Sequence, residues 1–219
     1  MDADRVQRRV DCSQAQENTD LDRLEKQIDF IRYIDKEKAI KRHTFKTDME
    51  RENDAEHAWH MSIMTMLLAE YANEKIDKLR TIEMLLIHDL VEIGAGDTYA
   101  YDESAKKTQR ERELASADEL FEKLPKDQAK FMRELWDEFE AGQTAEARFA
   151  RTMDNFQPVL LNDATGALAW RENAVKISQI LKRNENTAKG SRELWDYEYE
   201  KFIKANLKKG NIVNDLGIE

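Results

Sequence analysis

The sequence has very little cysteine, glycine or proline. Among its 219 residues there is one cysteine, Cys12, which excludes a disulfide framework and a zinc site built on cysteines. Seven glycines and two prolines, set against 37% charged residues, are too few for a turn-rich β protein and favour long helices with solvated faces. The length is sufficient for one domain with a sizeable core.

Long apolar runs are missing as well. No run approaches the roughly 18 residues that a membrane-spanning helix needs, and the polar start MDADRVQRRVD differs from a secretory signal peptide. We therefore expect a soluble, cytoplasmic protein with no membrane partner. The formal net charge of −10 disfavours polymeric nucleic acid as a partner, but it allows a small phosphorylated substrate where basic residues gather.

The spacing of apolar residues predicts one all-α domain of about eight helices over residues 20–207. No repeat, low-complexity segment or linker indicates a second domain. We expect a disordered or marginally helical tail at residues 1–19 and a frayed end at residues 208–219. Asp20 suits the N-cap of a first helix. That helix is predicted to contribute packing through an apolar stripe of Leu21, Leu24, Ile28 and Ile31.

Residues 84–97 hold the densest group of chemically active side chains. His88, Asp89 and Glu92 interrupt an apolar run that is typical of a buried helix leading into a glycine-rich turn. Burying an imidazole beside a carboxylate is costly unless a partner compensates, and one divalent ion beside the helix can reach both side chains. The alternative is a core histidine next to a helix-terminal Asp. The turn brings Asp97 back towards the same place.

A second candidate ligand comes from a helix predicted to begin at Asn53 or Asp54. His57 heads the buried apolar stripe of this helix. His60 follows three residues later and is a rival ligand by spacing. The alternative is that one or both histidines only cap the core.

A third candidate lies in a helix predicted to start after Thr144. Asp154 sits beside the apolar stripe of this helix, either as an inward-facing acid or as a surface carboxylate at the edge of the stripe. Pro158 is expected to kink or end the helix. Two histidines and two carboxylates suit a borderline divalent ion such as Mn, Fe or Co, and also Zn or Mg.

Basic residues gather between Asp35 and Lys46, where they make up five of twelve positions in an otherwise acidic chain. Arg42 in this segment suits the binding of two phosphate oxygens at once. A solvated helix face is an equally consistent interpretation, because Asp35 and Glu37 partly offset the positive charge.

In their order and spacing, these residues resemble the HD-domain superfamily of metal-dependent phosphohydrolases. The pattern of that family is a His, a later His-Asp doublet and a distant Asp. It is matched by His57 in DAEH, His88-Asp89 in IHDL and Asp154 in ARTMD. The resemblance is closest to the 5′-deoxynucleotidase branch and runs from about Lys41 to Leu160.

The resemblance implies a helical HD-domain bundle and particular roles for the residues that match. It implies that His57, rather than His60, joins His88, Asp89 and Asp154 as ligands of one divalent ion: Mn, Co, Fe, Mg or Zn. It also implies that Glu92 is catalytic and that Asp97 contacts the sugar. The best match to the phosphate-binding Arg of the branch is Arg42. Some members follow that Arg with Trp, whereas this chain has His43, which weakens an inference of deoxyribose selectivity.

The implied activity is hydrolysis of the 5′-phosphate of (deoxy)nucleoside monophosphates. Alternatives are an HD phosphohydrolase that acts on a triphosphate, a phosphodiester or another small molecule, and a regulatory HD module that binds a nucleotide without hydrolysing it. A helical scaffold with a structural metal is a further alternative. The resemblance also implies a homodimer, for which the aromatic-rich C-terminal helix is one candidate contact.

Overall fold

The computed structural model describes residues 21–102 and 104–218, and of Lys106 it describes the backbone only. The expectations for residues 1–19, including Cys12, and for the N-cap at Asp20 lie outside these residues. The helical elements in chain order are residues 21–34, η1 (Asp35–Ala39), α2 (Asp54–Leu68), η2 (Ala69–Tyr71), α3 (Lys78–Ile87), α4 (Glu92–Ala95), α5 (Lys106–Phe121), α6 (Lys126–Ala141), α7 (Ala145–Ala164), α8 (Leu168–Glu172), α9 (Ile177–Arg183), α10 (Thr187–Gly190), α11 (Arg192–Glu198), η3 (Tyr199–Ile203, a π-helix) and α12 (Lys204–Lys208). The predicted all-α class is confirmed.

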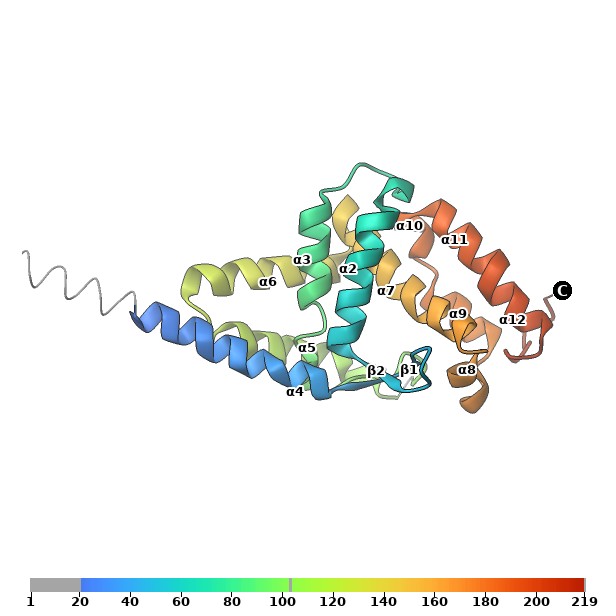
Figure 1. Ribbon diagram of the computed structural model, residues 1–219, viewed down its shortest axis with the longest axis horizontal. Coiled ribbons are helices and arrows are strands. Elements are labelled where there is room, and N and C mark those ends of the chain that lie inside the picture. The colour runs from blue at the N-terminus through green and yellow to red at the C-terminus, as the bar shows by residue number, and fades with distance from the viewer. Residues whose placement is uncertain (1–20, 103, 219) are drawn as a thin grey trace, which may run out of the picture.

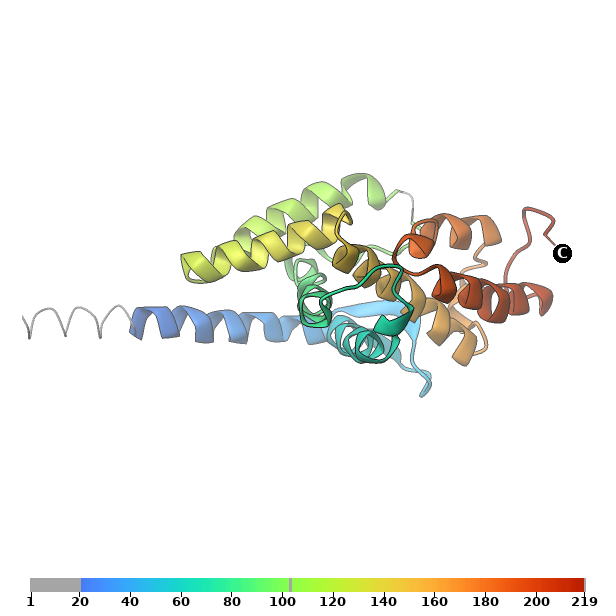
Figure 2. The ribbon, with the colours of Figure 1, turned by 90° about the horizontal axis from the view of Figure 1, so that it is seen from above.

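The helices form two layers around a central helix. Residues 21–34, α2 and α3 lie along one side, and α5 and α6 lie along the other (Figures 1 and 2). Helix α7 runs between them and continues to the end of the molecule formed by α8 to α12. No helix in the described part of the chain is long and apolar enough to cross a membrane.

Two apolar clusters hold these layers together, and α7 contributes to both. The larger cluster includes Met61, Met84 and Trp136, and α7 adds Phe149 and Met153 to it. The smaller cluster, which includes Trp170, Ile177, Ile180 and Ile203, receives Val159 from the same helix. A helix buried on several sides in this way is held in place by both ends of the fold, which makes it a rigid support for side chains that point into its surroundings.

Local signals in the sequence explain where the central helices begin and end. The Asn53 side chain accepts a hydrogen bond from the Glu56 backbone N–H, and the Glu56 side chain accepts one from the Asn53 backbone N–H, so α2 begins with a full capping box. Thr144 caps α7, as its sequence indicates, and Gly142 ends α6 with a φ of 59°. Of the two effects expected of Pro158, a kink or an end of the helix, the end is excluded, because α7 continues through it to Ala164.

A short hairpin is the one β-sheet among the described residues, and the sequence analysis did not foresee it. Strand β1 (Lys41–Phe45) pairs with β2 (Arg51–Asn53) in an antiparallel arrangement, with Lys41 opposite Asn53. The hairpin leads directly into the first turn of α2. It therefore places Arg42 beside that turn, rather than on the solvated helix face considered above.

The first helix departs from its predicted role. Its stripe of Leu21, Leu24, Ile28 and Ile31 is exposed, each residue by 39% or more, and Phe30 instead contacts the core. The helix is tied to α6 at its start, where Arg23 donates to Asp127 over 2.7 Å. Periodicity identified the helix correctly, but it could not say which of its faces meets the rest of the chain.

The end of the chain also differs from the frayed segment expected at residues 208–219. Ile212 is 3% exposed and belongs to the smaller apolar cluster. The Val213 N–H donates to the Val175 carbonyl, and the Ile177 N–H donates to the Val213 carbonyl, both over 2.9 Å. These bonds hold residues 209–218 against the C-terminal helices. The expected domain limits at residues 20 and 207 stay predictions.

Candidate metal centre and active-site pocket

Three candidate ligands from three different helices meet in the interior. His57 lies in the first turn of α2, His88 follows the last residue of α3, and Asp154 lies in the middle of α7. One ligand atom of each lies within 4.8 Å of the others, a spacing that one metal ion can bridge. Between these groups, the His57 Nε2 and Asp154 Oδ1 atoms are 3.2 Å apart. The sequence interpretation in which Asp154 faces inward is therefore the correct one.

The two histidine rings are held with the same nitrogen facing the centre. The Nδ1 of His57 lies 2.9 Å from Gln157 Oε1, and the Nδ1 of His88 lies 2.9 Å from the Leu85 carbonyl oxygen. Because both partners are oxygens that accept, each Nδ1 carries the hydrogen, and each Nε2 can offer a lone pair to a cation. Both rings are buried, at 0% and 5% exposure. The hydrogen bond at each Nδ1 is the second contact that metal-binding histidines ordinarily have.

His60, the rival of His57, lies outside this group. Its Nδ1 faces Gln157 Nε2 at 3.1 Å, and its ring stacks near Trp59 at the surface of α2. Burial lowers the pKa of His60, so its ring is neutral at neutral pH. The structure thus shows that His57, and not His60, lies beside His88 and Asp154, a choice that the sequence spacing alone left open.

Asp89 and Asp154 each combine a contact at the centre with a contact to an arginine. Asp89 Oδ2 lies 3.1 Å from His88 Nε2 and 2.7 Å from Arg42 Nη1. The Oδ2 of Asp154 accepts from Arg183 Nη2 over 2.9 Å, so that its Oδ1 turns to the histidines. Burial alone raises the pKa of each carboxyl, but these cations outweigh it and lower both pKa values below the ordinary range. Both side chains are therefore ionised.

Arg42 enters the centre from β1. Its Nη1 donates to Asp54 Oδ1 over 3.0 Å as well as to Asp89, and its Nε lies 3.9 Å from Glu52 Oε2. Burial alone lowers the pKa of Arg42, but the surrounding carboxylates raise it further above its ordinary value, which keeps the guanidinium charged. The basic segment thus contributes one largely buried cation, Arg42, while Lys36, Lys38 and Lys41 stay exposed.

Carboxylates outnumber the cations around this centre. Glu52, Asp54 and Glu92 are all at most 9% exposed, and each has a buried oxygen without a hydrogen-bond partner among the described residues. Burial, followed by the negative charge of neighbouring acids, raises the pKa of Glu92 to about 11 and that of Asp54 to about 7. The pKa of His88 is raised to about 9, because Asp89 and Asp154 outweigh the effect of its burial.

These observations fit a divalent cation. Among the described residues, the buried Nε2 of His88 makes no hydrogen bond, although Asp89 Oδ2 lies 3.1 Å from it, and Glu52, Asp54 and Glu92 each keep an unpaired buried oxygen. Two neutral imidazoles and two carboxylates form a donor set that suits a borderline divalent ion. Such an ion would supply the positive charge that the buried acids lack, and it would displace the proton from His88 on binding.

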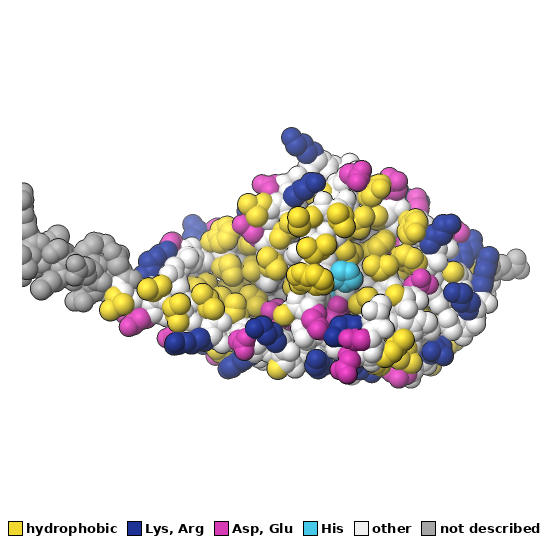
Figure 3. Space-filling model, viewed as in Figure 1, with side chains coloured by type: hydrophobic (Ala, Val, Ile, Leu, Met, Phe, Trp, Pro, Cys, Tyr) yellow, Lys and Arg dark blue, Asp and Glu magenta, His cyan; other side chains and the backbone are white. Residues whose placement is uncertain are grey.

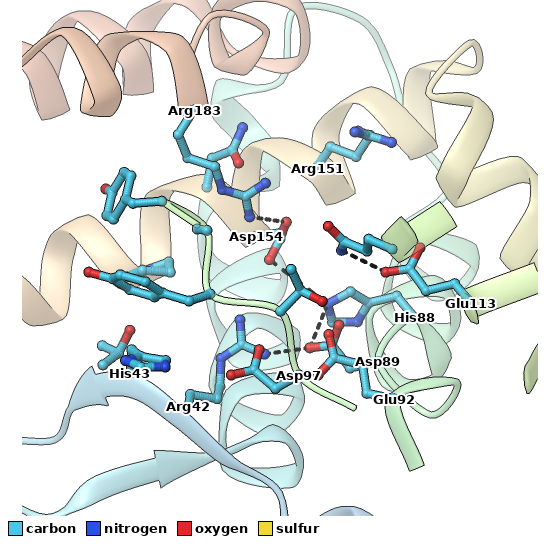
Figure 4. Close-up of a pocket in the computed structure, with 18 of the residues that line it drawn as sticks. Arg42, His43, His88, Asp89, Glu92, Asp97, Glu113, Arg151, Asp154 and Arg183 are labelled. Carbon is cyan, nitrogen blue, oxygen red and sulfur yellow. Dashed lines mark hydrogen bonds and ion pairs between the residues drawn. The ribbon is translucent and has the colours of Figure 1, made fainter. Parts of the chain in front are cut away.

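The centre opens into a cavity of about 400 Å³. Figure 4 shows Arg42, Asp89, Glu92 and Asp97 on one side of it and Arg183 and Arg151 on the other. Its volume lies within the range of roughly 300–1,000 Å³ that is usual for small-molecule sites. A pocket with cations on opposite walls suits an anionic ligand of nucleotide size.

Asp97 reaches the pocket through a constrained turn. Gly96 has a φ of 78°, a conformation that side chains other than glycine rarely adopt. Arg112 pins the turn by donating to the Ala95 carbonyl and, over 2.8 Å, to Thr98 Oγ1. Burial, the larger effect, combines with nearby Asp89 to raise the pKa of Asp97 despite the charge of Arg42.

His43 forms part of an aromatic wall of the same pocket. Its ring lies against that of Tyr99, with centroids 4.0 Å apart, and Tyr99 in turn packs edge-on against Tyr101. Tyr101 is partly buried, and its pKa is raised to about 12, mainly by desolvation. The loop that carries the two tyrosines therefore supplies flat surfaces beside the candidate ligand site.

Several residues of the site were missed by the sequence analysis. Gln157 lies three positions after Asp154 on a helix and interrupts apolar neighbours, so its spacing offered a signal. Its Nε2 donates to Glu52 Oε1 over 2.6 Å while its Oε1 holds His57. Arg183 lies 29 residues beyond Asp154 in sequence, and nothing in its local pattern indicates a role.

These features define a helical protein with a buried His-Asp centre for a divalent cation. The chain belongs to the HD domain family, whose model matches residues 34–195. It is similar to a crystal structure described as a predicted metal-dependent phosphohydrolase from Magnetospirillum magnetotacticum. The TM-score is 0.82 and the identity 43%, and the match covers 87% of this chain and 96% of that one.

The curated relatives are more distant. The 5′-deoxynucleotidase HDDC2 of Homo sapiens is 27% identical over 135 residues, which are 61% of this chain and 65% of that protein. The protein of the same name from Xenopus laevis is 32% identical over 109 residues, or 50% of this chain and 53% of its own. The chain thus spans less than two thirds of the length of these relatives.

Proposed function

We propose that the protein is a divalent-metal-dependent phosphohydrolase that removes the 5′-phosphate from (deoxy)nucleoside monophosphates. The observation that carries this proposal is the meeting of His57 with His88 and Asp154, of which the last two line a pocket together with Arg42 and Glu92. A structural metal site has its ligands closed off from solvent, whereas this group borders a cavity. The names of the curated relatives and of the similar crystal structure support the same class of reaction.

We assign the metal to His57, His88, Asp89 and Asp154. When bound, a divalent ion supplies positive charge that polarises a phosphoryl group and lowers the pKa of water. Gln157 and the Leu85 carbonyl orient the two imidazoles for this role, and Arg183 orients Asp154. Two protein nitrogens and two carboxylate oxygens leave room for further oxygen ligands around an ion of this kind.

Glu92 is the proton carrier of the proposed reaction. Water attacks phosphorus, and the bond between phosphorus and the sugar oxygen breaks. Burial, with the charge of Asp89 and Asp54, raises the pKa of Glu92, which favours a carboxyl that can give a proton to the departing oxygen and regain one from the attacking water. Its unpaired, buried Oε2 has no other hydrogen bond to break among the described residues.

Arg42 and Arg183 neutralise the phosphate in this proposal. Each lines the pocket and contacts one ligand carboxylate, Asp89 or Asp154, which places the two guanidinium groups on either side of the centre. A phosphoryl group gathers negative charge as it is transferred, and cations already in place stabilise that charge without reorganisation. Asp97 is assigned to a sugar hydroxyl.

The sugar and base preferences depend on the wall formed by His43 and Tyr99. Paired rings present a flat, partly polar surface that can face a ribose or stack on a base. His43 replaces the Trp that some related enzymes have, so selection of deoxyribose over ribose is one outcome of the test rather than part of the assignment. The native metal, a cytoplasmic location and a homodimer stay predictions.

The test is phosphate release from a panel of ribo- and deoxyribonucleoside 5′-monophosphates. The protein is stripped of metal and supplied in turn with Mn, Co, Mg or Zn, and 3′-monophosphates and triphosphates serve as comparison substrates. We expect metal-dependent release from the 5′-monophosphates and at least a 100-fold loss, on the order of an essential charge contact, in Asp154→Asn. Binding of a nucleotide without release under every metal would contradict the proposal and favour a regulatory module.

A further inference from the structure

The pocket beside the candidate metal centre has two ends of different character, and one of them is charged. At this end, Arg110 pairs with Glu140 over 2.8 Å, and Arg151 donates to the Glu140 carbonyl over 2.9 Å. Figure 4 shows Arg151 and Glu113 on the side of the centre that lies away from His43. A flat, neutral ligand group gains little among such charges, so this end suits the polar parts of a substrate.

The other end of the pocket is aromatic and apolar. Beside His43, Tyr99 packs edge-on against Tyr101, with ring centroids 5.4 Å apart. Tyr101 in turn packs against the smaller apolar cluster, to which Val159 and Trp170 belong. We call the residues that line this part of the pocket the aromatic end: Tyr99, Tyr101, Pro158, Val159, Ala169 and Trp170. Rings and apolar walls of this kind are the surroundings in which proteins ordinarily hold a nucleobase.

Asn162 places a polar side chain beside the aromatic end. It lines the pocket, is 5% exposed and lies one helical turn after Pro158 on α7. Its Nδ2 donates to the Pro158 carbonyl over 2.8 Å, whereas its buried Oδ1 has no hydrogen-bond partner among the described residues. A buried acceptor without a partner is costly. The amide oxygen is therefore the end of this side chain that is left for a ligand.

The hydrogen bond to Pro158 also fixes the direction of the amide. An asparagine side chain can in general turn over and offer either its oxygen or its N–H groups. If Asn162 turned over, its Oδ1 would meet the Pro158 carbonyl, and two acceptors would be in contact. Asn184, a second buried asparagine of the pocket, has an oxygen that already accepts from Thr187 Oγ1 over 3.3 Å. Asn162 thus keeps an unused acceptor that cannot be exchanged for a donor.

We propose that the aromatic end holds the nucleobase and that Asn162 selects bases with an exocyclic amino group over bases with an oxygen at the same ring position. This inference rests on the proposed function, because it names the substrate class of the same pocket. The amino groups of adenine and cytosine donate to Oδ1, whereas the corresponding oxygens of hypoxanthine and uracil would face a second acceptor. A site that offers one fixed hydrogen-bonding group discriminates in this way, because the mismatched base leaves two acceptors unpaired.

A purely structural role for Asn162 makes a different prediction. In that role only Nδ2 matters, because it binds a carbonyl one turn earlier, and the identity of the base has no effect. Asn173 shows the same kind of bond outside the pocket: it follows α8, and its Nδ2 donates to the Ala169 carbonyl over 2.8 Å. Asn173 is exposed and therefore provides a matched control.

The test compares kcat/KM within two pairs of deoxynucleoside 5′-monophosphates, adenine with hypoxanthine and cytosine with uracil. With metal supplied, the unaltered protein should favour the amino member of each pair by about 10-fold, the effect of one hydrogen bond. Asn162→Leu removes the acceptor while keeping a side chain of similar size. It should bring both ratios close to one, mainly through KM, because the contact is made to the base and not to the reacting phosphate.

Asn173→Leu is the control, and both of its ratios should equal those of the unaltered protein. Ratios close to one in the unaltered protein would overturn the proposal without any variant being needed. Ratios that persist in Asn162→Leu would overturn it as well, and circular dichroism shows whether that variant is folded.

A binding measurement separates this proposal from the proposed hydrolysis. Calorimetry on the metal-loaded Glu92→Gln variant should give a Kd about 10-fold lower for the adenine nucleotide than for the hypoxanthine nucleotide. Hydrolysis of all four nucleotides with equal kcat/KM would support the phosphohydrolase and refute selection by Asn162. If none of them is hydrolysed, the proposed function fails, and the ratio of the two Kd values decides the role of Asn162 by itself.

Discussion

The two sides of α2 contrast sharply in what they bury and what they expose. On the inner side of its first turns, Asp54 and His57 are fully buried among other charged groups. On the outer side, Trp59 and Ile63 face solvent. An ordinary surface helix has the opposite arrangement, with apolar residues inside and charged residues outside.

The contrast indicates that each side of α2 carries a surface that the single chain leaves in an unfavourable environment. Buried acids without hydrogen-bond partners are costly, and a cation removes that cost. Apolar side chains in contact with water are costly as well. The inner side therefore points to a positively charged ligand, whereas the outer side is left facing solvent (Figure 3).

The largest expected effect tests the chemistry of the inner side. Glu92→Gln keeps the shape of the side chain but removes its proton transfer, so kcat should fall by about 10²–10⁴-fold. Metal content, measured by atomic emission on the purified variant, should stay equal to that of the unaltered protein, because Glu92 is not an assigned ligand. Full turnover of the metal-bound variant would contradict the role of Glu92 in proton transfer.

The next effect concerns a residue that orients a candidate metal ligand without being a ligand itself. Gln157→Leu removes the acceptor for His57 Nδ1 and the donor to Glu52 while conserving size. Metal affinity should fall by about 10–100-fold, because the imidazole loses the contact that orients it. Competition with a chelator of known affinity measures this fall.

Gln109→Leu is the matched control for that experiment. Gln109 also lines the pocket, but it donates to Glu113 over 2.7 Å, and Glu113 is not a proposed ligand. Its variant should keep the metal affinity of the unaltered protein. Equal loss in both variants would attribute the effect to general weakening of the pocket.

The smallest expected effect tests whether a buried acid outside the candidate metal centre lowers the free energy of unfolding. Glu198 at the end of α11 is 0% exposed, and neither of its carboxylate oxygens has a hydrogen-bond partner among the described residues. Burial raises the pKa of Glu198 well above its ordinary value of 4.5. In contrast to the metal centre, no neighbouring charge contributes to this shift.

The sign of the pH dependence follows from that shift. Because the folded state binds this proton more tightly than the unfolded state, the contribution to stability is fully present below pH 4.5 and is lost as the pH rises. Glu198→Gln should therefore increase the free energy of unfolding at pH 7 by about 1–2 kcal/mol. The gain should shrink as the pH falls towards 4, as urea unfolding at several pH values can measure.

Glu200→Gln provides the comparison for that change. Glu200 lies two residues away, is exposed and pairs with Lys204 over 3.2 Å. Its replacement should change stability by less than about 0.5 kcal/mol. If Glu198→Gln does not increase the free energy of unfolding at pH 7, then some interaction that is not evident from the geometry compensates the buried Glu198 carboxylate.

Helical spacing in the sequence narrowed the candidate ligands but left His57 and His60 as rivals and the direction of Asp154 open, and the family resemblance selected the set. The caps at Asn53 and Thr144 indicated where two of the helices begin. These signals are local, because caps and stripes depend on residues within a few turns. Their combined order in the chain also carried the family resemblance, which the HD domain match to residues 34–195 confirms.

Local patterns did not foresee the hairpin or the contacts made by arginines. Strand preference depends strongly on the surroundings, and β1 is a short strand in a segment with many basic residues. Arg42 from β1 meets the centre through Asp89, and Arg183 from α9 meets it through Asp154 of α7, so both contacts depend on how distant segments pack together. The roles assigned to Glu92, Asp97, Arg42 and His43 stay predictions until they are measured.

The sequence by itself determined that this chain is helical and that it carries a histidine and carboxylate set of the HD type. Only the tertiary structure decided which histidine faces Asp154, which cations surround it and which apolar stripe is left outside. The physical reason is that periodicity shows that a helix has two faces, whereas burial depends on what the rest of the chain packs against each one. For α2 and helix 21–34, that packing leaves a large apolar surface facing water.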